Sequence, residues 1–133
     1  MKMFLVHVGD DNFCRVLPKQ LDRSKSGNGR VKVMAFPPLG IQTLAPVLRK
    51  RGHQVRMFDT CHPRMKAEHI AEAVAQDQPG AIALSFLSTT TYPAVKSMAR
   101  RLKTEAPKIP IIAGGAFATL NADRILADCL DID

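Results

Sequence analysis

The chain has 133 residues, 46% of them hydrophobic and 23% charged, with a formal net charge of +7. This length and composition are typical of one soluble globular domain with a single core, so we treat residues 1–133 as one domain. No apolar run is long enough to cross a bilayer, and the N-terminus lacks a signal-peptide pattern, so we expect a cytoplasmic protein without membrane contact. Nucleic acid is disfavoured as a partner, because one tyrosine and no tryptophan leave little for base stacking.

The positive charge is uneven along the chain. Residues 10–30 form a long loop rich in basic residues, and a loop of this length within a domain is typically functional or disordered. Its charge suits the phosphates of a ligand or an acidic partner surface.

Short apolar runs alternate with helical patterns from the N-terminus onward. Residues 3–8 predict a buried strand, residues 9–30 carry no pattern, and residues 31–36 are extended. A helix should follow Pro38 and end before Gly52, with an apolar face made by Ile41, Leu44, Ala45 and Leu48. Polar and apolar residues then alternate over 54–59, which predicts a half-exposed edge strand.

The second half of the chain continues the alternation. We expect a helix over 64–76, strands buried on both faces at 81–87 and 109–113, and a helix over 121–129 with Asn121 as its N-cap. Between the two buried strands, a helix is predicted by the spacing of its apolar residues, Val95, Met98, Ala99 and Leu102. Residues 131–133 resemble the entry to a fifth strand.

This pattern predicts an α/β fold, a flavodoxin-like (Rossmann-like) three-layer sandwich. Its parallel sheet should have the order 2-1-3-4-(5), with the fifth strand incomplete. In such sheets ligands bind beyond the carboxyl ends of the strands. Ser85 to Thr91 and Gly114-Gly115 follow two of these strands.

Several familiar sites are absent or weak. No G-x-G-x-x-G or P-loop follows the first strand. Asp10-Asp11 resembles the acidic pair of a phosphoacceptor receiver domain, but Ser85 stands where that domain needs an aspartate. His7 has the setting of a core histidine, and Asp59 that of a loop cap. His62 follows a strand and is a metal-ligand candidate of low specificity.

Thiols and hydroxyls leave alternatives open. Cys14, Cys61 and Cys129 are odd in number and widely spaced, which argues against disulfides, a zinc ribbon or an iron–sulfur cluster. Cys129 fits the core, whereas the other two fall in loops after strands, where a free thiol near the site is possible. The hydroxyls of residues 88–91 can cap the following helix or bind a polar ligand.

Three groups of residues carry a family resemblance. The first group lies within residues 37–59 and consists of Pro37-Pro38-Leu39-Gly40, Leu44-Ala45, Leu48-Arg49, Gly52-His53-Gln54-Val55 and Asp59. The second group is Ser85-Phe86-Leu87. The third group is Gly114-Gly115 with Ala118-Thr119. In this order they resemble a cobalamin-binding domain, particularly the N-terminal domain of cobalamin-dependent radical-SAM enzymes.

The resemblance implies a cofactor site. The serine of S-x-L, here Ser85, would hydrogen-bond the dimethylbenzimidazole tail of cobalamin, and Gly114 and Gly115 would leave the tail room. The remaining residues assigned to the cofactor site are Leu39, Gly40, Leu87, Ser88, Thr89, Thr90, Phe117 and Ala118. The D-x-H-x-x-G element that supplies a histidine to cobalt in methionine-synthase-like members is absent, so we expect no metal ligand from this domain.

The resemblance also implies a larger assembly. No C-x-x-x-C-x-x-C is present to hold a 4Fe-4S cluster, and the Gly-Glu-rich segment after strand five is missing. We therefore expect a fragment or split part of an enzyme, whose radical-SAM catalytic domain, with its cluster and S-adenosylmethionine, lies in the same polypeptide or a separate subunit. Relatives include methyltransferases and the anaerobic ring cyclase of chlorophyll synthesis. The alternative is a non-catalytic flavodoxin-like module that binds a nucleotide or a partner protein.

Overall fold

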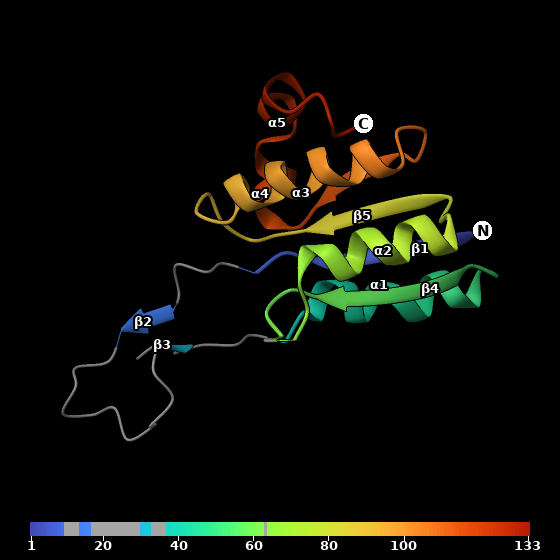
Figure 1. The fold of residues 1–133 in the computed structure, drawn as a ribbon, viewed down its shortest axis with the longest axis horizontal. Coiled ribbons are helices and arrows are strands. Elements are labelled where there is room, and N and C mark those ends of the chain that lie inside the picture. Colours follow the sequence, from blue (N-terminus) through green and yellow to red (C-terminus); the bar gives the residue numbers. More distant parts are fainter. Residues whose placement is uncertain (10–13, 17–29, 33–36, 63) are drawn as a thin grey trace.

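A parallel four-stranded sheet forms the centre of the protein (Figure 1). The structure is a computed structural model that describes residues 1–9, 14–16, 30–32, 37–62 and 64–133. The strands lie in the order β4-β1-β5-β6, which is 2-1-3-4 along the sheet and confirms the predicted flavodoxin-like topology. Their bounds are Lys2–His7 for β1, Gln54–Asp59 for β4, Ala81–Ser85 for β5 and Ile111–Gly114 for β6.

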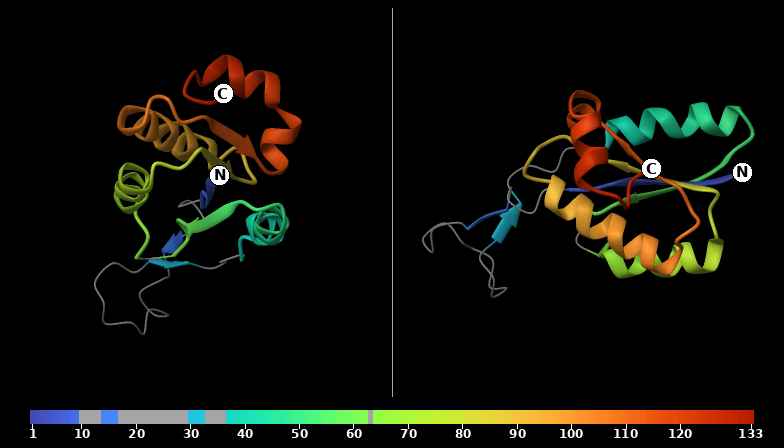
Figure 2. Two further views of the ribbon diagram at one scale, coloured as in Figure 1. Left: turned by 90° about the vertical axis from the view of Figure 1, so that its right-hand side faces the viewer. Right: turned by 90° about the horizontal axis from the view of Figure 1, so that it is seen from above.

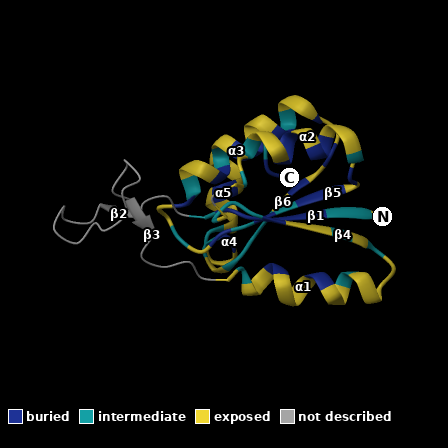
Figure 3. Cartoon of the chain, turned by 60° about the horizontal axis from the view of Figure 1, so that its bottom comes forward, coloured by how far each residue is buried: buried dark blue, intermediate teal, exposed yellow. Residues whose placement is uncertain are grey.

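Helices α2 (Ala67–Asp77) and α3 (Tyr92–Glu105) cover one face of this sheet (Figure 3). The four apolar residues predicted to face inward from α3 are all buried. They join the larger core cluster with Phe4, Val6, Ile82 and Leu84 of the strands. Cys129 is buried in the same cluster, as predicted.

Helix α1 (Leu39–Lys50) lies on the opposite face, as Figure 2 shows from two directions. Its Ile41 and Ala45 form a small second core with Leu5 of β1, against which Val55 and Ala83 pack. Two predictions fail on this face. Ile112 of β6 is 46% exposed and Leu44 of α1 is 43% exposed. Among the described residues, α1 is the one helix that contributes to this second core, so part of the sheet on this face remains open.

Two further elements differ from the predictions. Cys14–Val16 (β2) lies in the segment predicted to carry no pattern, and it pairs antiparallel with Arg30–Lys32 (β3), which overlaps the start of the stretch predicted to be extended. The rest of the loop and residues 33–36 lie outside the described part of the chain. The helix predicted over 121–129 is present as α5 (Ala122–Asp128), and a short helix that the sequence did not predict, α4 (Ala116–Leu120), precedes it. Asn121 between them donates its side-chain amide to the Phe117 carbonyl and does not cap α5.

The final residues lie along the outer side of β6. Ile132 is buried, and the amide of Asp133 donates to the Ile111 carbonyl at 2.9 Å. The Asp133 carboxylate accepts from the Ile111 amide, and hydrogen bonds from Lys103 and then Ile111 lower its pKa. Within the described residues, no helix is both long and apolar enough to span a membrane.

Candidate functional site

Four side-chain positions form a row across the carboxyl ends of the strands. The strand registers place His7 between Asp59 of β4 and Ser85 of β5, and Ser85 beside Gly114 of β6. Side chains alternate between the faces of a sheet, and Leu5 and Ala83, two residues earlier, contact the α1 side. The row therefore faces the side of the sheet on which α1 lies.

The N-terminus of α1 approaches this row at Ser85. A Cβ atom on Gly40 would lie 3.8 Å from the Ser85 hydroxyl oxygen. Leu44 is one turn further along the same flank of α1, so it too lies toward β5. Leu39, the first residue of the helix, is 63% exposed.

An uncovered part of the sheet surface extends from Ser85 toward β6. We name it the open strip and define it as Ala83, Ser85, Ile112 and Gly114, which are neighbours in register. Ala83 and Ser85 are partly exposed, and among the described residues the Ser85 hydroxyl has no hydrogen-bond partner. The strip thus combines apolar surface, an available hydroxyl and a residue without a side chain. The sequence analysis did not single out Ala83 and Ile112. They could have been found by noting that one helix is too narrow to cover this whole face of the sheet.

The two consecutive glycines have different roles. A Cβ atom on Gly114 would meet nothing within 4 Å, so the space beside it on the strip is open. Gly115 has φ +100° and ψ 176°, and a Cβ there would lie 2.2 Å from the Phe86 carbonyl oxygen. The room expected beside Gly115 is therefore filled by backbone, which corrects the idea that both glycines leave space for a ligand.

The loop after β5 brings a second set of predicted residues to the carboxyl edge. Leu87 is 59% exposed, and Thr89 and Thr90 are exposed. The Ser88 hydroxyl is within hydrogen-bond distance of the Thr90 and Thr91 hydroxyls, at 2.9 and 3.0 Å. Thr91 is the N-cap residue of α3 but makes no side-chain capping bond, so capping by this hydroxyl, one of the alternatives that the sequence left open, is not observed.

Two predicted site residues lie elsewhere. Ala118 is buried in the larger core, and the Phe117 ring packs against Phe86 and Tyr92 with centroids 5.7 and 5.8 Å apart. Phe117 also lines, with Thr89, a cavity of about 640 Å³ beside α3 and α5. Burial and then a hydrogen bond to Asp128 raise the pKa of Tyr92 in this cavity to about 12. Neither Phe117 nor Ala118 is brought to the open strip.

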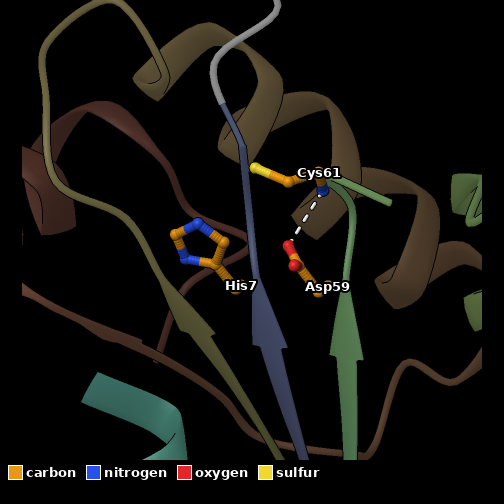
Figure 4. A group of neighbouring side chains, drawn as sticks. All are labelled: His7, Asp59 and Cys61. Carbon is orange, nitrogen blue, oxygen red and sulfur yellow. Dashed lines mark hydrogen bonds between the residues drawn. The ribbon is translucent and has the colours of Figure 1, made fainter. Parts of the chain in front are cut away.

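The histidine singled out from the sequence is also separate from the row. His62 is exposed, and its Nδ1 accepts a hydrogen bond from the Arg64 amide at 3.3 Å. The potential ligand atoms that do converge belong to His7, Asp59 and Cys61, all within 4.8 Å of one another (Figure 4). Sequence inspection did not group these residues, although β1 and β4 were expected to be neighbours ending at one edge.

Comparison with known families agrees with this geometry. A family model described as "B12 binding domain" matches residues 27–133, which is most of the chain. The chain belongs to the B12-binding domain family. The predicted resemblance to a cobalamin-binding domain is thereby confirmed.

One curated relative is similar to this B12-binding domain. It is an anaerobic magnesium-protoporphyrin IX monomethyl ester cyclase from Synechocystis, 28% identical over 105 residues. The match covers 78% of this chain and 21% of the cyclase, so the chain spans about a fifth of that relative.

Proposed function

We propose that this B12-binding domain binds cobalamin with the nucleotide tail of the cofactor laid along the open strip. The observation that carries the proposal is the strip itself. A well-packed α/β domain would be expected to cover Ile112, in the strip, and Leu44, on the helix beside it, yet both are more than two-fifths exposed. An aromatic base such as dimethylbenzimidazole would remove this apolar surface from water.

The residues of the strip fit such a tail. Ser85 is partly exposed, and its hydroxyl can donate to the unsubstituted ring nitrogen of dimethylbenzimidazole, which is an acceptor. Gly114, its neighbour in register, leaves the space above β6 free. The start of α1 is close to Ser85, because a Cβ atom on Gly40 would lie 3.8 Å from its hydroxyl oxygen. Leu39 and Leu87, both exposed, flank the carboxyl edge where the larger ring of the cofactor would rest.

Within this proposal the hydroxyl-bearing loop has a supporting role. Ser88, Thr89 and Thr90 lie beyond the carboxyl end of β5, where polar groups of the cofactor would be solvated. Phe117 and Ala118 act through packing, because the Phe117 ring contacts Phe86, beside which Gly115 turns, and Ala118 is buried in the same core.

We further propose that the domain is the cofactor module of a radical-SAM methyltransferase or cyclase. Cobalamin, when bound, supplies methyl-transfer or redox chemistry at cobalt. The S-adenosylmethionine and 4Fe-4S cluster would belong to a catalytic partner, in the same polypeptide or another subunit. Similarity to the Synechocystis cyclase, of which this chain matches only 21%, supports such a modular arrangement.

Replacing Ser85 with alanine tests the polar part of the site. A hydrogen bond of this kind is worth about 1 kcal/mol, so we expect cobalamin affinity to fall roughly fivefold while the fold is kept. The measurement is an absorbance titration with hydroxocobalamin, alongside circular dichroism. Ser97→Ala, an equal change on an exposed position of α3, is the matched control. Equal affinity in the two variants would contradict the role of Ser85.

A further inference from the structure

The side chains of His7, Asp59 and Cys61 bring three kinds of ligand atom to one place. An imidazole nitrogen, a carboxylate oxygen and a thiol sulfur all lie within 4.8 Å of one another. His7 is only 9% exposed, and Figure 4 shows the cluster at the ends of β1 and β4. It is next to the open strip but shares no residue with it.

The backbone holds these groups in register. His7 and Asp59 are paired residues of neighbouring parallel strands. The Thr60 amide then donates to the His7 carbonyl at 3.0 Å, and the Gly9 amide donates to the Thr60 hydroxyl at 2.7 Å. Because the two strand ends are bonded to each other, His7 and Asp59 have little freedom to separate.

The thiol is placed by two further contacts. The amide of Cys61 donates to Asp59 Oδ1 at 2.9 Å, which folds the turn back toward the strand end. A Cβ atom on Gly9 would lie 2.4 Å from Cys61 Sγ, so the sulfur rests directly on the glycine backbone. The thiol therefore lies over the end of β1, on the same side as the other two ligand atoms.

This combination of ligands matches a particular class of ion. Thiolate, imidazole and carboxylate are the three groups that bind Zn²⁺, and three protein ligands with an open fourth position are common for that ion. Bond lengths of about 2.0–2.3 Å place tetrahedral ligand atoms roughly 3–4 Å apart, so atoms that lie within 4.8 Å of one another need to approach by at most about 2 Å. Calcium and magnesium, which prefer oxygen ligands, do not match.

We propose that His7, Asp59 and Cys61 form a site for a divalent transition-metal ion of the Zn²⁺ class, separate from the cobalt of cobalamin. The site does not depend on the proposed cofactor function, because none of its ligands lies on the open strip. The cluster lies at the carboxyl ends of β1 and β4, where solvent or a ligand could supply a fourth ligand atom.

Titration of the metal-stripped chain with Zn²⁺ tests this site, with Co²⁺ salt as a spectroscopic probe. We expect one Zn²⁺ per chain by metal analysis after gel filtration, and a thiolate-to-cobalt charge-transfer band with Co²⁺. Cys61→Ser should abolish the band and weaken Zn²⁺ binding about 100-fold or more. Asp59→Asn, which keeps an acceptor for the Cys61 amide, should weaken it less.

One control uses a histidine outside the cluster. His62→Ala should leave the Zn²⁺ affinity and the cobalt band unchanged, because His62 is exposed and its Nδ1 already accepts from the Arg64 amide. As a readout on the unmutated chain, Zn²⁺ should slow alkylation of Cys61 by iodoacetamide, measured by peptide mass spectrometry. The proposal is overturned if Zn²⁺ gives no protection of Cys61, or if Cys61→Ser binds Zn²⁺ as tightly as the unmutated chain.

Discussion

Replacing Gly114 with leucine is expected to reduce cobalamin affinity by roughly 100-fold or more, equivalent to about 3 kcal/mol of binding free energy. The reason is steric. A side chain on Gly114 enters open space above β6 and meets no protein atom within 4 Å at its Cβ, so it would occupy the strip along which the nucleotide tail is proposed to lie. The cobalamin affinity of the Gly114→Leu variant is measured by absorbance titration with hydroxocobalamin.

The fold should tolerate this change. Gly114 is the last residue of a strand, and its φ lies outside the left-handed region that favours glycine. A leucine there replaces the most flexible residue type by one compatible with extended backbone. Ala75→Leu, which adds a leucine at an exposed position of α2 on the opposite face, is the control for a general effect. Unchanged cobalamin affinity in a folded Gly114→Leu variant would mean that the tail does not lie there.

Replacing the next residue, Gly115, with alanine should lower the free energy of unfolding by about 3 kcal/mol. Its backbone angles, φ +100° and ψ 176°, lie in a region that residues with a Cβ atom hardly adopt. In addition, the new methyl would lie 2.2 Å from the Phe86 carbonyl oxygen, so the backbone between β5 and α4 must move. Urea denaturation, with comparison of midpoints and slopes, measures the change.

Gly114→Ala is a matched control for this second change, because it adds the same methyl one residue earlier. With nothing within 4 Å of its Cβ, that variant should unfold with nearly unchanged free energy. A similar loss of stability in both variants, or in neither, would contradict the different roles assigned to the two glycines.

The sheet and its order follow from the sequence because burial dictates the pattern. Val95, Met98, Ala99 and Leu102 are spaced for one helix face, and all are buried against the sheet. Patterns of this kind do not tell whether a second face is covered. Ile112 and its buried neighbour Ile111 are the same residue type in the same apolar run. Ile112 is nevertheless 46% exposed, because α1 lies over β1 and β4 and does not reach β6 on this face. The pairing of β2 with β3 uses backbone hydrogen bonds, for which the side-chain pattern gave no sign.

The site residues that lie at strand ends were predictable from the sequence. The features that depend on backbone angles and strand register were not. Ser85 and Gly114 lie at the ends of β5 and β6, as the α/β pattern requires. The two glycines are adjacent in the sequence, but only backbone angles reveal that one faces open space and the other a carbonyl. Similarly, the convergence of His7, Asp59 and Cys61 requires the register between β1 and β4 and the turn after Asp59. Linear spacing does not encode either feature.

The most direct measurement of the central claim compares cobalamin with cobinamide, which lacks the nucleotide tail, in binding to the unmutated chain. If the tail lies on the open strip, hydroxocobalamin should bind with one cobalt per chain, and cobinamide should bind roughly 100-fold more weakly or worse. Gly114→Leu should bind both only as weakly as the unmutated chain binds cobinamide. Absence of cobalamin binding, or equal binding of the two compounds by the unmutated chain, would contradict the account.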